Sequence, residues 1–206
     1  MKLEKHVLKA IEAHDRGSTD EALMHAAVAI DGTARKLFGK AGANIYKDCI
    51  RKYYWIVERF VGEGLNLVET KWTHLKLVNG NGKPILEPDL ADIIYHIFRC
   101  NDVHATEIPI KFEILPKKNN HHIWHIDIAN SGVRMPEAII WALLAISVFS
   151  KVNSDIKTDG EHWLSWGSDQ IGYTRFTIKE YWGKEKELDD FFLNKPTVRI
   201  KIDKLT

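Results

Sequence analysis

Cysteine is scarce in this sequence. The chain has two cysteines among its 206 residues, Cys49 and Cys100, and they have neither the spacing of metal ligands nor the number that a disulfide framework needs. The class of small secreted domains held together by disulfides is therefore excluded. With so few cysteines, the default expectation is a protein of the reducing cytoplasm.

A strong excess of charge of one sign is also lacking. The 29 lysine and arginine residues nearly balance the 28 aspartate and glutamate residues, which gives a formal net charge of +1. The overall charge therefore does not attract nucleic acid. Any affinity of this chain for nucleic acid must come from a local patch. The pair Arg51 and Lys52 is a small basic spot of this kind, and we expect it to be solvated surface.

Long hydrophobic runs are lacking as well. The longest run, residues 138–149, has about half of the roughly 20 residues that a membrane-spanning helix needs. The N-terminal stretch MKLEKHVLKAIEAH is charged throughout and lacks the apolar core of a signal peptide. We therefore expect no membrane partner. At this length, one domain or one domain with an elaboration is expected.

Hydrophobic periodicity predicts helices in the first half of the chain. A short first helix is expected to stop at Gly17. Ser18 and Glu21 form a capping-box pattern ahead of a second helix that runs to Gly39. A long helix over residues 44–61 is expected to pack antiparallel against the second helix, because the link between the two is short.

Periodicity of two residues appears in the second half. Residues 108–114 and 124–128 alternate apolar and polar side chains, which predicts the two strands of a hairpin. Residues 135–152 predict the most apolar helix, buried on more than one side. Further expected elements are a turn at NGNG 79–82, a strand at 171–178, a helix at 179–192 and an alternating stretch at 198–203.

These elements predict an α+β fold. Residues 1–106 form an N-terminal helical bundle, and residues 107–206 form a small antiparallel sheet with helices that packs on it. No linker separates the two portions, because Thr106 leads directly into the strand that follows. The two portions can therefore belong to a single domain.

The stretch 89–106, DLADIIYHIFRCNDVHAT, carries the main candidate site. Pro88 suits the first turn of a helix, and Asp89 places a negative charge at the positive end of the helix dipole. Apolar residues then recur at helical spacing. Arg99 and His104 stand near the far end, so a permanent cation and a titratable imidazole come together there.

This arrangement resembles the HEPN superfamily, whose members carry an arginine, four to six residues and a histidine at the end of a helix in a small helical bundle. The resemblance covers roughly residues 1–106. It implies metal-independent endoribonuclease chemistry without a cofactor, often in toxin-antitoxin or antiviral defence systems. It also implies that two protomers bring their motifs together, so a homodimer and an antitoxin or defence partner protein are expected.

The residue types suit RNA cleavage. RNA supplies its own nucleophile in the 2′-hydroxyl, so His104 can act as general acid or base while Arg99 clamps the phosphate. Residues five apart on an ideal helix are separated by about 140°. Arg99 and His104 therefore converge only if the helix ends between them or a partner chain supplies the second group. Supporting residues are Asn101, Asp102, His96 and Tyr95.

Structural readings compete with these assignments. Arg99 can pair with Asp102 on the same helix, and His104 can simply interact with the C-terminal end of the helix dipole. A non-catalytic interaction module with a degenerate motif is the alternative function, with the apolar helix 138–149 docking a protein partner.

Two aromatic and histidine-rich stretches remain. In HHIWHID, residues 121–127, His125 and Asp127 share one side of a strand and can offer two ligands to a metal, but a closed site needs more. No metal site is predicted from them. Trp163 and Trp166 stand near His162 in a polar region, where they can pack in the core or stack on RNA.

Overall fold

The computed structural model describes residues 2–61, 65–79, 81–96, 111–115, 126–129, 132–168 and 172–194. Their mixed α+β architecture confirms the predicted fold class. The helices are α1 (Leu3–Asp15), α2 (Thr19–Phe38), α3 (Ala43–Lys52), α4 (Tyr54–Val61), α5 (Leu90–Ile94), α7 (Ala138–Phe149), the 3₁₀ turn η2 (Lys151–Asn153), α8 (Ile178–Tyr181) and α9 (Glu185–Leu193). The strands are β1 (Leu77–Val78), β2 (Pro84–Ile85), β3 (Lys111–Leu115), β4 (Asp127–Ala129), β5 (Gly132–Pro136), β6 (Trp163–Ser168) and β7 (Gly172–Thr177).

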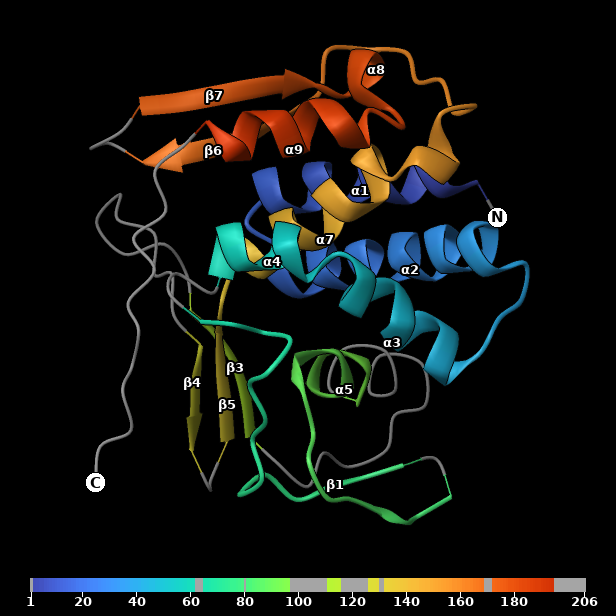
Figure 1. Ribbon diagram of the computed structural model, residues 1–206. Helices are drawn as coiled ribbons and strands as arrows, with labels where there is room; N and C mark the ends of the chain where they lie inside the picture. Colours follow the sequence, from blue (N-terminus) through green and yellow to red (C-terminus); the bar gives the residue numbers. More distant parts are fainter. Residues whose placement is uncertain are drawn as a thin grey trace.

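Helix α7 lies at the centre of the molecule. Its sequence, AIIWALLAISVF, carries no charge, and every side chain except that of Trp141 is buried. Helices α2 and α4 pack against it, with smaller contacts from α1 and α8 (Figure 1). A helix that is apolar on all sides must be covered on all sides. The predicted burial of this stretch on more than one side is confirmed.

The other elements lie on two sides of these central helices. Figure 1 shows the β3–β5–β4 sheet and α5 on one side, and the β6–β7 hairpin with α8 and α9 on the other. A single hydrophobic core contains buried residues from both halves of the chain.

The predicted hairpin between 108–114 and 124–128 is wrong. Strand β5 lies between the two strands, parallel to β3 and antiparallel to β4. Val133 of β5 thus stands opposite both Phe112 and Ile128. Alternation of apolar and polar residues predicts a strand but not its neighbour. Val133 and Met135 of β5 are buried, and β5 is the central strand of the sheet, whereas the sequence predicts that a helix begins at Met135.

Two predicted helices are interrupted. The helix over 44–61 divides into α3 and α4 at Tyr53, whose φ is −108° and ψ is 23°. The Tyr53 hydroxyl is buried there, 2.7 Å from Ser150 Oγ and 2.9 Å from Glu185 Oε2. The helix over 179–192 divides into α8 and α9 at Gly183. Both interruptions allow distant segments to pack, which periodicity cannot reveal.

Helix ends and turns are better anticipated. Helix α1 ends before Gly17 and α2 ends at Gly39, as predicted. Both glycines have a positive φ. The NGNG turn is confirmed, because the Asn79 N–H donates to Lys83 O and closes the loop between β1 and β2. The capping box at the start of α2 does not form: Ser18 makes no capping hydrogen bond, and Glu21 pairs instead with an arginine. The stretch 198–203 lies outside the described residues.

Gly183 allows a close approach between α8 and the end of α7. Its φ is +74°, its N–H donates to Val148 O at 2.8 Å, and an added Cβ would lie 2.5 Å from Ser154 Cα. We therefore expect Gly183→Ala to lower the free energy of unfolding by about 3 kcal/mol, from backbone strain and overpacking together. Urea denaturation measures this loss.

Gly39→Ala is the matched control. Gly39 has nearly the same φ, +69°, but an added Cβ would meet nothing within 4 Å. This variant should lose only the strain contribution, about 1 kcal/mol. Equal losses in the two variants would contradict the proposed close approach.

Candidate functional site

The start of α5 is a fully formed helix cap. The Asp89 side chain accepts a hydrogen bond from the Asp92 N–H, and the Asp92 side chain accepts one from the Asp89 N–H, at 3.0 and 3.3 Å. Asp89 is therefore the N-cap, and Pro88 precedes the cap and does not occupy the first turn as expected. The Ala91 N–H donates to the Tyr54 hydroxyl at 2.9 Å. This anchors the first turn of α5 to α4.

Two cations of α3 bind the same carboxylates. Arg51 contacts Asp89 through Nε at 2.8 Å and Nη2 at 3.2 Å, and its Nη2 lies 3.1 Å from Asp92 Oδ2. Lys47 Nζ lies 2.9 Å from Asp92 Oδ1. Lys71 Nζ approaches Asp89 at 3.5 Å. Because Lys47 and Arg51 are four residues apart, they share one face of α3 and meet the two carboxylates together.

The two carboxylates and Lys47 of this ionic network are largely withdrawn from water. The side chains of Asp89, Asp92 and Lys47 are 5%, 7% and 12% exposed. Burial by itself would raise the pKa of Asp89, but hydrogen bonds from Arg51 and from the Asp92 N–H hold that pKa well below its usual value. Hydrogen bonds to Asp89 likewise outweigh burial and raise the pKa of Arg51. Asp89 and Arg51 are thus both charged at neutral pH.

Tyr95 and His96 continue α5 as a π-type turn and lie beside the network. The Tyr95 ring meets Tyr46 and His96 edge to face, each at 5.5 Å between centroids, and Lys47 Nζ lies 6.0 Å from its centre. Burial, followed by repulsion from Lys47, lowers the pKa of His96 despite the opposite effect of Asp92. His96 is therefore neutral near pH 7, and a neutral imidazole can accept a proton.

The remaining predicted site residues lie outside the described residues. These are Arg99, His104, Asn101 and Asp102. The structure thus describes the beginning of the predicted site helix, with two of the predicted supporting residues, Tyr95 and His96.

The prediction of a solvated basic spot is wrong for Arg51, because its guanidinium is bound to Asp89 and Asp92. Lys52 is exposed, as expected. Lys47 was not singled out from the sequence. A signal was present: two cations four residues apart on one predicted helix match two acids three residues apart at the start of another.

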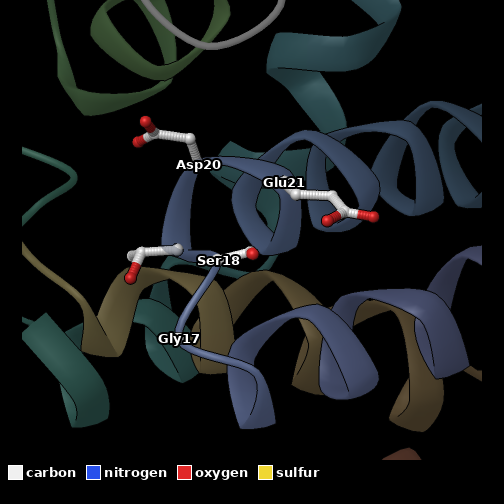
Figure 2. Close-up of a pocket in the computed structure, with 5 residues that line it drawn as sticks. Gly17, Ser18, Asp20 and Glu21 are labelled. Atoms are coloured by element: carbon white, nitrogen blue, oxygen red, sulfur yellow. The ribbon is translucent and has the colours of Figure 1, made fainter.

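The pocket at the start of α2 is a weaker candidate for a binding site. Residues 17–21 line a pocket of about 460 Å³ at the start of α2 (Figure 2). Figure 2 shows the labelled side chains of Asp20 and Glu21 pointing in different directions. Glu21 Oε2 already lies 3.1 Å from Arg16 Nη2. The lining therefore provides no set of groups that converge on one ligand.

Metal ligands do not assemble in the part of the chain that the structure describes. His6 Nδ1 and His25 Nδ1 lie 3.1 Å apart between α1 and α2. No group of three potential ligands surrounds them or any other described point. The histidines of the stretch 121–125 lie outside the described residues.

The apolar helix 138–149 does not provide a docking surface, because α7 is buried in the core.

The two tryptophans near His162 differ in their exposure to water. Trp166 packs against Phe191 and Phe192 and donates its Nε1–H to Arg59 O, whereas Trp163 is 43% exposed.

The fold and the site define a mixed α+β protein in which a buried ionic network fixes the start of a helix with a neutral histidine on its second turn. A sequence model of the Rv1289 family matches residues 2–205. The chain belongs to the Rv1289 family.

Three mycobacterial proteins are similar to this chain. They are the uncharacterized proteins Rv1289 and MT1327 from two strains of Mycobacterium tuberculosis and Mb1320 from Mycobacterium bovis. Each is 30% identical over 179 residues, which cover 86% of this chain and 81% of the relative. No solved structure matches this chain. In the described ranges, every helix is too short or too polar to cross a membrane.

Asp89 connects the ionic network to stability at low pH. Its lowered pKa in the folded state means that the carboxylate stabilises the fold fully above the unfolded-state pKa of about 3.9. That stabilisation is lost as the pH falls through the folded-state pKa. We expect Asp89→Asn to lower the free energy of unfolding by roughly 3 kcal/mol at pH 7, because it removes the buried carboxylate charge that Arg51 and Lys71 contact. The difference from the wild type should narrow below about pH 4.

Asp48→Asn is the matched control for this experiment. Asp48 contacts the same Arg51 at 3.1 Å, but its side chain is 49% exposed, so its loss should cost less than about 1 kcal/mol. Urea denaturation at a series of pH values measures both variants. Equal losses, or a gap for Asp89→Asn that persists unchanged at low pH, would contradict the role assigned to this network.

Proposed function

We propose that this protein is a metal-independent endoribonuclease, or an RNA-binding protein, of the toxin-antitoxin or antiviral defence type. It acts in the cytoplasm without a cofactor, with Arg99 as phosphate clamp and His104 as general acid or base. One observation carries the proposal: the helix that leads towards these residues is fixed at its start by a buried ionic network. The HEPN-like sequence pattern that follows α5, Arg99 to His104, supplies the residues for the chemistry.

The reaction needs a proton acceptor near neutral pKa and a fixed cation. A base removes the proton from the 2′-hydroxyl, the 2′-oxygen attacks the phosphorus, and the 5′-oxygen leaves with a proton from an acid. The products are a 2′,3′-cyclic phosphate and a 5′-hydroxyl. His104 suits the acid or base role because an unperturbed imidazole titrates near neutral pH. Arg99 can stabilise the negative charge that builds on the phosphate oxygens, since its guanidinium can bind two of these oxygens.

Positioning is the proposed role of four further residues. Tyr95 and His96 precede Arg99 in the sequence, and Asn101 and Asp102 follow it in the motif. A rigid helix start supports this role, because a catalytic group must be held close to its productive geometry. A homodimer would let one protomer supply the second group of the motif, and an antitoxin or defence partner protein would control the activity.

The test is cleavage of RNA in the presence of EDTA. We expect wild-type protein to cut cellular RNA and leave cyclic-phosphate ends. Because general acid-base catalysis contributes at least about 100-fold, His104→Ala and Arg99→Ala should each lower the cleavage rate by at least that factor. Gel analysis of the RNA and chemical analysis of the product ends measure the effect.

His74→Ala serves as the control, since His74 is an exposed histidine that does not belong to the motif 99–104. It should cleave RNA as the wild type does. Circular dichroism verifies that all variants fold. Equal cleavage by wild type and His104→Ala would rule out the assigned catalytic role. A folded wild type without any cleavage would favour a non-catalytic module that binds a protein partner.

A further inference from the structure

The β6–β7 hairpin has one buried and one exposed face. Leu164 and Phe176 stand opposite each other in the antiparallel register, and both point into the core, at 3% and 6% exposure. Successive residues of a strand point to opposite faces. The adjacent positions Trp163, Ser165 and Arg175 accordingly lie on the outer face, and all three are exposed.

Packing in the core does not explain why Trp163 is exposed. Trp166, on the same strand, shows the structural use of tryptophan: its ring packs on two phenylalanines and its Nε1–H reaches a backbone carbonyl. Trp163 instead leaves 43% of its surface in contact with water. Keeping a large apolar ring in water forgoes the stabilisation that its burial would give.

Arg175 lies against this exposed ring. Trp163 pairs with Thr177 across the two strands, so Arg175 is its diagonal neighbour. The guanidinium carbon lies 5.0 Å from the centre of the Trp163 ring, within range of a cation-π interaction. Among the described residues, no carboxylate lies within ion-pair distance of Arg175. The outer face thus combines an aromatic plane and a cation, and none of the four positions Trp163, Ser165, Arg175 and Thr177 is acidic.

From this surface we infer a second contact to RNA: the outer face of the β6–β7 hairpin binds single-stranded nucleic acid, with a base stacked on Trp163 and a phosphate neutralised by Arg175. Aromatic rings on an exposed sheet face stack bases of any sequence, and an adjacent arginine attracts the backbone. A protein partner would be expected to need a larger apolar area than a single exposed ring.

This inference deepens the proposed function and rests on it for the choice of RNA as the physiological strand. Figure 1 shows the β6–β7 hairpin and α5 on opposite sides of the central helices. The surface is therefore separate from the ionic network at the start of α5. Its loss should raise the KM for long RNA while kcat stays close to the wild-type value.

Binding is measured separately from cleavage with a fluorescently labelled deoxyuridine strand of about 10 nucleotides. This probe has no 2′-hydroxyl and cannot be cut by the proposed chemistry. Fluorescence anisotropy should show that Trp163→Ala raises the Kd about 10-fold, whereas Trp163→Phe keeps a stacking plane and stays within about 3-fold of the wild type. Arg175→Ala should reduce the slope of log Kd against log salt by about one.

Phe38→Ala and Arg134→Ala are the matched controls. Phe38 is an aromatic residue with similar exposure, 39%, at the end of α2, and Arg134 is an exposed arginine of β5. Neither change should alter the Kd. Absence of binding by the wild type, equal weakening by Phe38→Ala and Trp163→Ala, or equal affinity for a DNA duplex would each overturn the inference.

The two proposals fail in different ways. If Trp163→Ala weakens binding of the uncleavable strand but wild-type protein cuts no RNA, the binding surface stands and the ribonuclease function fails. If cleavage depends on His104 but Trp163→Ala does not change the Kd for the probe, the ribonuclease function stands and the binding surface is refuted.

Discussion

The burial of α7 is the constraint on which the rest of the structure depends. A helix of twelve residues without a charged side chain is stable in water only when other elements cover nearly all of it, and here only Trp141 is not fully buried. Helices from the first half of the chain, α2 and α4, cover it together with α1 and α8. The two halves of the chain therefore share one core. Strand β5, which leads into α7, is the central strand of its sheet and buries Val133 and Met135.

A second constraint is ionic and acts at the edge of this core. Asp89 and Asp92 are buried at the start of α5, and a buried carboxylate is costly unless it is paired and hydrogen-bonded. Lys47 and Arg51 provide that pairing from α3. The network thereby fixes the position and direction of the helix that carries His96, and the charge of Lys47 helps to lower the pKa of this imidazole.

The two proposed RNA contacts differ physically. The proposed motif, Arg99 and His104, would act on the phosphate and the 2′-hydroxyl, where precise placement of charge matters most. The outer face of β6–β7 would act on bases and backbone without regard to sequence, through Trp163 and Arg175. Such a division lets the affinity for a long strand change without altering the reacting groups.

The sequence by itself determined the fold class, the ends of α1 and α2, the turn after Asn79 and the burial of α7, because these depend on local periodicity and on glycine at positive φ. It also marked Asp89 as a helix start. Only the tertiary structure decided that β5 separates β3 from β4, that Tyr53 interrupts a helix, and that Arg51 binds Asp89. Strand neighbours, helix breaks and buried ion pairs depend on segments far apart in the chain, and local patterns carry no information about which distant segment will be the partner.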